Sequence, residues 1–273
     1  MKTRVITAAV LVPLLLLVLF AAPKNVMVIL FSLLCAFSAV ELLYNTGLVK
    51  HIRLVIYTVV MAVLVPVWCY FGMNKEWALA ATLLFMVLLF MEVMISDMKL
   101  RFDRICICLA GGILIPFLLS SLVRIIVLDN GRYVILIPFV VAFLSDSGAY
   151  FIGCRFGKHK LAPLISPKKS IEGVFGGAAF AAIGMLLYVL VLQIFFKASV
   201  NYGYALVYAI IGTAIGVFGD LCFSVIKRQT AIKDYGNLFP GHGGVLDRFD
   251  SMLFVCPLIE LLLDVLPVVV VPI

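Results

Sequence analysis

The strongest constraint on the fold of this chain is a succession of long apolar runs. They lie at residues 5–22, 26–43, 54–73, 77–95, 105–127, 133–154, 173–196, 204–223 and 251–271. Each run is close to the roughly 20 residues that a helix needs to cross the hydrocarbon core of a bilayer. Hydrophobic residues make up 65% of the chain, well above the share in soluble domains. The sequence therefore predicts an all-α polytopic integral membrane protein with about nine transmembrane helices.

The basic residues predict how these helices are oriented. If the N-terminus, with Lys2 and Arg4, starts in the cytoplasm and the chain crosses at every run, most of the 21 Lys and Arg residues fall on the cytoplasmic side. Such an excess is typical of cytoplasmic loops. We therefore interpret residues 1–22 as a first span rather than a cleaved signal peptide. The polar segments 155–169 and 224–250 are then expected to face the cytoplasm.

Polar residues at membrane depth are unevenly distributed along the chain. Residues 1–140 are mostly simple spans, with Glu41 near a helix end and Glu92 inside a helix. In residues 141–273, polar side chains recur within or next to the spans. We therefore expect one integral membrane domain over 1–273, with a scaffold in its first part and the catalytic machinery in its second.

Glycines recur at helical spacing on two of the predicted spans. They are Gly173, Gly176 and Gly177 on one span, and Gly212, Gly216 and Gly219 on the next. Small residues at this spacing let a neighbouring helix approach closely. We expect tight helix packing at both faces, with no direct role in chemistry.

Asp220 is the acidic residue whose position most requires an explanation. It shares a helix face with Ser224, Lys227 and Arg228. A carboxylate in an apolar span is costly unless it is paired or hydrated. Taken alone, this helix is equally compatible with a hydrogen-bonded structural Asp, an ion-translocation residue and a catalytic metal ligand.

Asp247 favours the metal-ligand interpretation. It comes just before the last apolar run. If runs 204–223 and 251–271 are antiparallel neighbours, Asp220 and Asp247 meet at the membrane edge. Two carboxylates together with substrate phosphates are a common way of holding Mg²⁺. For Asp250 we prefer a structural role, as the N-terminal cap of the last helix.

The glycine-rich segment 240–244 has the backbone freedom to wrap an anion. A tight turn is the alternative, but Lys227, Arg228, Lys233 and Arg248 flank the segment and favour polyphosphate binding. His242, next to Gly243 and Gly244, is interpreted as a hydrogen-bond donor to a phosphate group rather than as an acid or base. Phosphoryl-type transfer depends mainly on positioning and charge neutralisation.

A second basic loop carries Lys168 and Lys169 directly before Ser170. Ser170 is a predicted N-cap of the span at 173–196, which would place both lysines beside free helix N–H groups. A phosphate site and a plain cytoplasmic anchor are equally compatible with this pattern. Asp146, on the preceding span, either pairs with one of these lysines or lines the polar cavity.

The segment from Ser224 to Asp250 resembles the signature of the phosphatidate cytidylyltransferases, also called CDP-diacylglycerol synthases. The residues that match are Ser224, Lys227, Arg228, Lys233, Asp234, Gly236, Phe239, Pro240, His242, Gly243, Gly244, Val245, Asp247, Arg248, Phe249 and Asp250. Segments 145–150 and 166–170 are also similar to family segments. The similarity therefore covers at least residues 140–255.

The resemblance implies that CTP and phosphatidate react to form CDP-diacylglycerol and diphosphate, with Mg²⁺. It implies a helical membrane protein with a cavity open to the cytoplasm, and a homodimer. The family's metal-binding aspartates would fall on Asp220 and Asp247, with K⁺ sharing that site. Lys227 and Arg228 would serve catalysis. Substrate binding would involve Ser224, Lys233, Asp234, His242, Gly243, Gly244, Arg248, Lys168, Lys169 and Asp146. No nucleic-acid partner is expected.

Two alternative functions have different signatures. A CTP-dependent polyprenol kinase would transfer the γ-phosphate, and the full pattern from Ser224 to Asp250 disfavours it. An ion-coupled transporter would use Asp146, Glu92 and Asp220 as sites near the middle of the membrane. Transporters usually contain internal repeats, and none is evident in this sequence.

Overall fold

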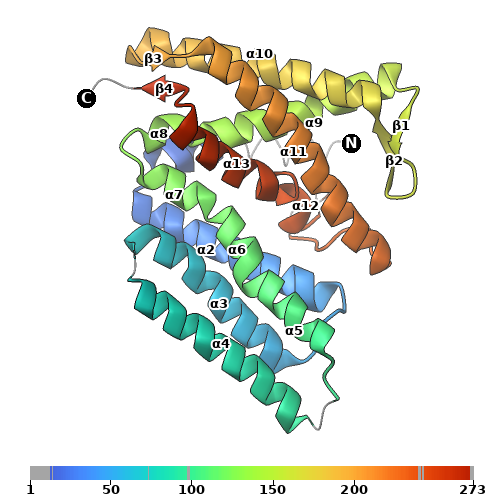
Figure 1. Cartoon of the computed structure of the whole chain (residues 1–273). Coiled ribbons are helices and arrows are strands. Elements are labelled where there is room, and N and C mark those ends of the chain that lie inside the picture. The colour runs from blue at the N-terminus through green and yellow to red at the C-terminus, as the bar shows by residue number, and fades with distance from the viewer. Residues whose placement is uncertain are drawn as a thin grey trace. The chain divides into compact units, whose positions relative to one another are not determined.

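The computed structural model describes residues 13, 15–72, 74–96, 99–238, 241 and 243–270. The described chain is predominantly helical (Figure 1). It is organised in two compact units, one with the residues up to Val127 and Gln229–Arg248, the other with Leu128–Arg228 and the residues from Phe249 onward. The glycine-rich loop thus belongs to the unit of the N-terminal helices, which were expected to be scaffold.

The first unit consists mainly of apolar helices, with one π-helical turn at the end of α2 and another between α5 and α6. Its helices are α2 (Lys24–Val40), η1 (Glu41–Asn45), α3 (Ile52–Phe71), α4 (Lys75–Ile95), α5 (Phe102–Leu109), η2 (Ala110–Leu114), α6 (Ile115–Leu119) and α7 (Ser121–Val127). The short α12 (Leu246–Phe249) begins in the same unit. A bilayer offers the backbone no hydrogen-bond partners, so these apolar segments satisfy their N–H and C=O groups internally by forming helices.

Close packing in the first unit is concentrated at η2. A Cβ atom on Gly111 would lie 2.8 Å from Cδ1 of Leu43, and one on Gly112 would lie 3.0 Å from the ring of Phe85. Leu43, Leu54 and Leu89 are fully buried in this part of the core. The end of α2 is therefore held firmly against its neighbours, and η1 continues directly from it.

The second unit is built around two long helices that lie side by side, α9 and α10 (Figure 1). Its elements are α8 (Gly131–Val134), α9 (Leu136–Phe156), β1 (Lys160–Ala162), β2 (Ser166–Ser170), α10 (Ile171–Phe196), β3 (Ser199–Val200), α11 (Tyr202–Gln229), α13 (Met252–Val265) and β4 (Val269–Val270). Strands β1 and β2 form an antiparallel hairpin, and β3 pairs with β4. The hairpin carries the Lys168–Lys169 pair into α10.

The glycine faces pack as expected. A Cβ atom on Gly219 would lie 2.7 Å from the ring of Phe254, and one on Gly216 would lie 3.1 Å from Val255. Helix α11 therefore packs closely on α13. The runs at 204–223 and 251–271 are therefore neighbours at this point.

Replacing Gly177 with Ala is expected to destabilise the second unit by about 1–3 kcal/mol, because the new methyl group overpacks the contact between α9 and α10. A Cβ atom there would lie 2.6 Å from the backbone oxygen of Ser145, which cannot rotate away. Thermal unfolding of the purified protein in detergent measures this effect. An unchanged melting temperature would contradict the packing.

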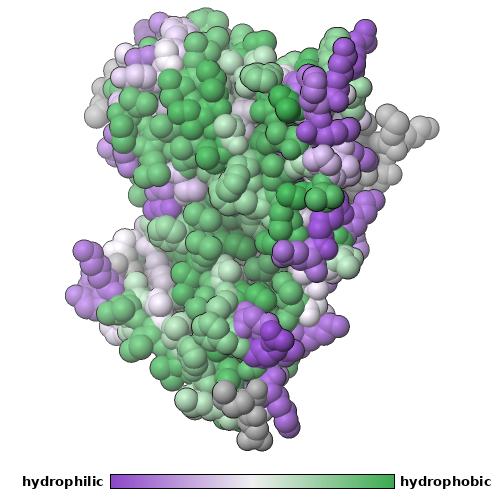
Figure 2. Space-filling view, turned by 45° about the vertical axis from the view of Figure 1, so that its right-hand side comes forward, coloured by the Kyte–Doolittle hydropathy of each residue, from purple (hydrophilic) through white to green (hydrophobic). Residues whose placement is uncertain are grey.

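Seven helices of the described chain are long and apolar enough to cross a membrane. They are Lys24–Asn45, Ile52–Phe71, Lys75–Ile95, Phe102–Val127, Gly131–Phe156, Ile171–Phe196 and Tyr202–Gln229. Their outward side chains are largely apolar (Figure 2). The protein is thus a polytopic integral membrane protein.

Two of the nine predicted runs are not among these seven helices. Of the run at 5–22, residues 5–12 and 14 lie outside the described residues, as do Lys2 and Arg4 before it, and residues 15–21 are helical. The run at 251–271 is helical over only the 14 residues of α13. That is shorter than the roughly 20 residues of a full crossing, because the helix stops before Leu266–Pro267.

Candidate functional site

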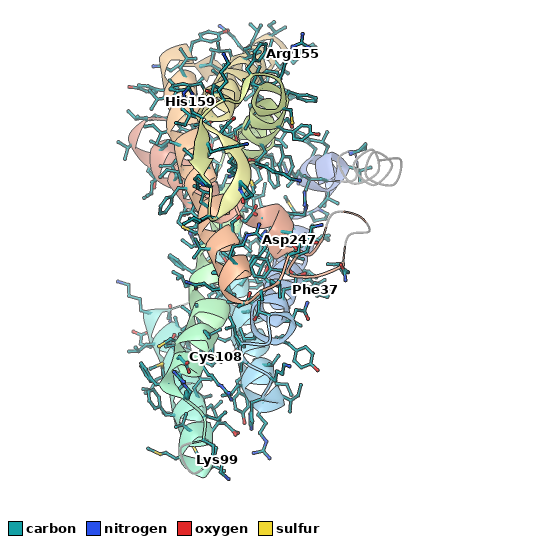
Figure 3. The ribbon with its side chains drawn as sticks, turned by 90° about the vertical axis from the view of Figure 1, so that its right-hand side faces the viewer. Phe37, Lys99, Cys108, Arg155, His159 and Asp247 are labelled. Carbon is teal, nitrogen blue, oxygen red and sulfur yellow. The ribbon has the colours of Figure 1, made fainter. Side chains whose placement is uncertain are left out.

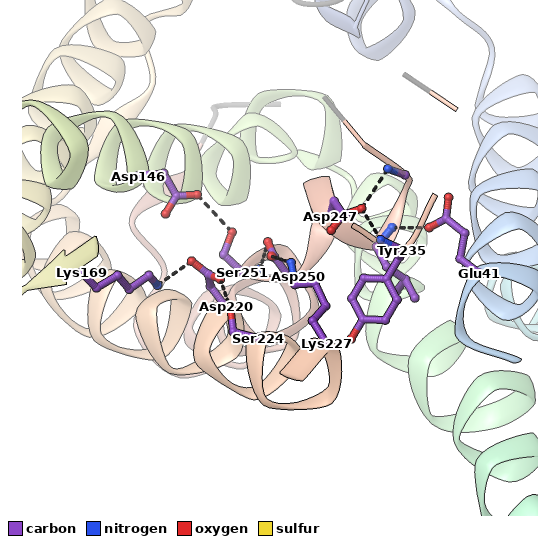
Figure 4. A network of polar contacts seen from close by, with 12 residues as sticks. Glu41, Asp146, Lys169, Asp220, Ser224, Lys227, Tyr235, Asp247, Asp250 and Ser251 are labelled. Atoms are coloured by element: carbon purple, nitrogen blue, oxygen red, sulfur yellow. Dashed lines mark hydrogen bonds and ion pairs between the residues drawn. The ribbon is translucent and has the colours of Figure 1, made fainter. Parts of the chain in front are cut away.

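Asp220 lies at the centre of a charged cluster in the second unit. Its Oδ1 accepts a hydrogen bond from the Ser224 hydroxyl at 3.2 Å, one helical turn along α11. Its Oδ2 lies 2.5 Å from Nζ of Lys169, which comes from strand β2 (Figure 4). The buried Lys169 ammonium has no hydrogen-bond partner of good geometry among the described residues. An ammonium has three N–H donors, so this one can still bind a phosphate oxygen.

Asp250 is a second carboxylate of the cluster. It lies in the turn before α13 and is 9% exposed. Its Oδ1 accepts a hydrogen bond from the N–H of Ser251 at 2.9 Å, and its Oδ2 is 3.9 Å from Nζ of Lys227. The predicted capping role was wrong: the N-cap of α13 is Ser251, and among the described residues no side chain caps this helix end.

Negative charge is concentrated around Asp250. Burial and then the nearby Asp220 raise the pKa of the Asp250 carboxyl to about 7, with Asp146 contributing and Lys227 opposing. Asp146, an exposed residue of α9, accepts a hydrogen bond from the Ser251 hydroxyl at 3.4 Å. A bound cation would relieve the repulsion between these carboxylates.

The hairpin that carries Lys169 is held at its base. Ser170 caps α10 as predicted, because its hydroxyl accepts the N–H of Gly173 at 3.1 Å. Glu172 accepts the N–H of Lys158 at 3.1 Å and lies 2.6 Å from Nδ1 of His159. His159 follows the end of α9, where the chain enters the hairpin (Figure 3).

The other basic residues of the second unit have different environments. Nε of Arg228 donates a hydrogen bond to the backbone oxygen of Ile165 at 3.1 Å, so Arg228 also anchors the hairpin. Lys168 is exposed, whereas the side chain of Lys169 is only 21% exposed. Of the two predicted phosphate-binding lysines, only Lys169 contacts Asp220. The contribution of His159 and Glu172 was not predicted, because neither belongs to a recognisable pattern.

Asp247 organises the glycine-rich loop in the first unit. It lies on α12 (Figure 3) and is 7% exposed. Its Oδ2 accepts the N–H of Tyr235 at 2.7 Å and the N–H of Gly244 at 3.0 Å. Gly243, with φ +84, has a backbone conformation that favours glycine.

A glutamate from the predicted scaffold reaches the same loop. Glu41, the first residue of η1, accepts the N–H of Val245 on Oε1 and the N–H of Leu246 on Oε2, each at 2.8 Å (Figure 4). Nδ2 of Asn45 donates to the backbone oxygen of Tyr235 at 2.9 Å. Sequence reasoning did not place Glu41 in the site. In the sequence, the indication for Glu41 was a lone carboxylate at the end of an apolar run.

The remaining predicted residues are less constrained. Lys233, Asp234 and Arg248 are exposed. His242 lies outside the described residues. Asp220 and Asp247 belong to different units, and each makes its polar contacts within its own unit.

The carboxylates of the second unit fit Mg²⁺ as part of a site. In the described ranges, no three His, Cys, Asp or Glu side chains form a group that could hold a metal ion by themselves. Mg²⁺ is commonly held by one or two carboxylates, with substrate phosphates and water completing its octahedron. Asp220 can supply one such carboxylate, and the Lys169 ammonium that pairs with it can also bind a phosphate oxygen.

The family model and the individual relatives that match this chain point to the same group of proteins. Residues 2–266 match the model of the cytidylyltransferase family. A phosphatidate cytidylyltransferase of Staphylococcus saprophyticus is 34% identical over 270 residues, 96% of this chain and 99% of the relative. The enzymes with that name from Bacillus subtilis and Staphylococcus epidermidis are 40% identical over 194 residues and 45% over 135 residues. These alignments cover 70% and 50% of this chain, and 69% and 50% of the relatives.

Proposed function

Because the chain belongs to the cytidylyltransferase family, we propose that it is a phosphatidate cytidylyltransferase, forming CDP-diacylglycerol and diphosphate from CTP and phosphatidate. The observation that carries the proposal is the pairing of Lys169 with Asp220, at 2.5 Å, in a cluster with Asp250 and Lys227. Binding a nucleoside triphosphate requires carboxylates that can hold a divalent cation and ammonium groups that can bind its phosphates.

The reaction needs positioned charges more than a proton acceptor. A phosphate oxygen of phosphatidate attacks the α-phosphorus of CTP, and the bond from that phosphorus to the β-phosphate bridging oxygen breaks. Diphosphate leaves with the electron pair. The attacking phosphate is already ionised at neutral pH, so no general base is required. The main role of the protein is to bind and orient the two anionic substrates.

In this proposal the basic residues hold phosphates and the aspartates hold the cation. Lys169, Lys227 and Arg228 would contact the triphosphate or the lipid phosphate. Asp220 and Asp247 would hold Mg²⁺, with K⁺ nearby. When bound, Mg²⁺ supplies positive charge for the α-phosphate and the departing diphosphate.

We further propose that the reaction takes place at the cytoplasmic edge of the membrane. Phosphatidate is embedded in the bilayer with its anionic head at the surface, so the site has to lie at the membrane edge. The distribution of Lys and Arg supports a polar cavity on the cytoplasmic side, where CTP is available. Assembly as a homodimer belongs to the same proposal.

The direct test is an assay of the purified protein with CTP, phosphatidate and Mg²⁺, in which lipid-linked CMP and diphosphate are measured together. Equal amounts of the two products are expected. Release of CDP with phosphorylation of a polyprenol would instead identify a kinase. Ion flux into proteoliposomes without CTP turnover would identify a transporter, and either result would overturn the proposal.

Replacing Lys169 with Met is expected to lower kcat/KM for CTP by about 10- to 100-fold, because Asp220 loses its positively charged neighbour and the phosphates lose a donor. Initial rates over a range of CTP concentrations measure the effect. The matched control is Lys160→Met, an exposed lysine on the other strand of the same hairpin, which should remain within about twofold of the wild type. Equal losses in both variants would contradict a specific role for Lys169.

A further inference from the structure

We propose that Glu41 is a positioning residue that holds the Asp247 loop in its active conformation. The Asp247 loop is defined here as the described residues 235–238, 241 and 243–247. The inference rests on the function proposed above, because it assumes that Asp247 serves catalysis. It assigns a functional role to a helix of the N-terminal part, far from the family's sequence signature.

The Glu41 carboxylate binds the loop through both of its oxygens. Each of its two oxygens accepts one N–H group, from Val245 and from Leu246, at the same distance of 2.8 Å. Glu41 is 4% exposed, so its charge is almost entirely removed from solvent. Burying a carboxylate is costly unless it is hydrogen-bonded, and two charge-assisted bonds offset this cost. The pairing is therefore specific to a carboxylate at this position.

The backbone of the loop lies very close to the Glu41 side chain. A Cβ atom on Gly236 would lie 2.6 Å from Oε1 of Glu41. On Gly244, a Cβ atom would overlap the same carboxylate. Both glycines thus allow the backbone to approach Glu41 more closely than any other residue would. Gly236 and Gly244 lie on different parts of the loop. Because both contact Glu41, this one side chain sets the distance between the two parts.

Glu41 and Asp247 bind neighbouring N–H groups of the same loop. Three successive N–H groups of the loop donate to two carboxylates: Gly244 to Asp247, and Val245 and Leu246 to Glu41. The orientation of α12, and with it the side chain of Asp247, depends on both anchors. A misplacement of about 1 Å at a catalytic group is enough to cost about 100-fold in rate.

The shape of the helix end supports the same role. Helix α2 ends in the π-helical turn η1, in which the N–H of Thr46 bonds to the oxygen of Glu41 at 3.3 Å. Within this turn, Glu41 and Asn45 both contact the loop, Glu41 through Val245 and Leu246 and Asn45 through Tyr235. Single π-helical turns inside α-helices are frequent at functional sites.

The decisive substitution is Glu41→Gln, which keeps the size of the side chain but replaces one acceptor oxygen with an NH₂ group. That group would face a backbone N–H, donor against donor. We expect kcat to fall by about 10- to 100-fold and the Mg²⁺ concentration for half-maximal rate to rise by about tenfold, because Asp247 is no longer held in place. The KM for phosphatidate should change by less than about twofold, because the buried Glu41 is proposed to act only through the loop that it binds.

A second measurement does not depend on activity. Hydrogen–deuterium exchange of the purified protein should become at least about tenfold faster in peptides that cover the Asp247 loop, with no change in α9 or α10. The matched control is Glu92→Gln. Glu92, on α4, is equally buried, at 5% exposed, and accepts a hydrogen bond from the hydroxyl of Tyr57 on α3 at 3.1 Å. The control should leave both the rate and the exchange of the loop unchanged.

The outcomes separate this inference from the proposed function. An active wild type with a normal rate in Glu41→Gln, or a lower rate without faster exchange in the loop, would overturn the inference and leave the function intact. A wild type that forms no CDP-diacylglycerol would overturn the function. If Glu41→Gln does not fold, Glu41→Asp keeps the charge with a side chain one methylene shorter, and the same two measurements apply to it.

Discussion

Asp220→Asn is expected to lower the rate of CDP-diacylglycerol formation by about 10²- to 10³-fold. The substitution removes the negative charge that pairs with Lys169 at 2.5 Å and that we propose holds Mg²⁺. An amide keeps nearly the same size and can still accept the Ser224 hydroxyl, so the helix packing should survive. Initial rates with CTP, phosphatidate and Mg²⁺ measure the loss, and thermal unfolding checks the fold.

The control for Asp220→Asn is Asp264→Asn. Asp264 is an exposed carboxylate near the end of α13, in the same unit as Asp220. This variant loses the same charge and should keep a rate within about twofold of the wild type. A near-normal rate in Asp220→Asn would refute the metal assignment, whatever the control does.

Asp247→Asn is expected to have an effect of similar size, about 10²- to 10³-fold on kcat. The amide oxygen can still accept the N–H groups of Tyr235 and Gly244, which the carboxylate binds at 2.7 and 3.0 Å. The variant therefore removes mainly the charge. Activity over a range of Mg²⁺ concentrations should show that saturating Mg²⁺ restores the rate only in part.

Asp247→Ala separates the charge of this residue from its structural role. It leaves two buried N–H groups without their acceptor and should also destabilise the protein by about 1–3 kcal/mol. Asp103→Asn, at an exposed carboxylate of α5, is the control within the same unit and should change neither property. If Asp247→Asn lost stability but kept its rate, Asp247 would be purely structural.

Much of the fold followed from local patterns. Seven of the predicted apolar runs correspond to helices long enough to span a membrane, and Ser170 caps α10 as expected. The tight packing at Gly216 and Gly219 was also predictable, because glycines at helical spacing produce a groove whatever helix fills it. The extent of the last helix was not, since α13 covers only 14 residues of its apolar run.

Within the site, the sequence identified residue types better than partners. It drew attention to Asp220, Ser224, Lys169 and Asp247, all of which make buried or partly buried polar contacts. It did not distinguish Lys169 from Lys168, because adjacent residues of a strand point in opposite directions and the register was unknown. It also assigned Asp250 to a cap, whereas the structure pairs it with Lys227.

The sequence by itself determined that this is a helical membrane protein, and it carried the signature of the family to which it belongs. Both are local properties, since a bilayer forces apolar segments into helices and the signature is contiguous. Only the tertiary structure revealed that Glu41 binds Val245 and Leu246, which are 204 and 205 positions away. Contacts of this kind depend on how helices pack and where side chains point, and neither is encoded in local spacing.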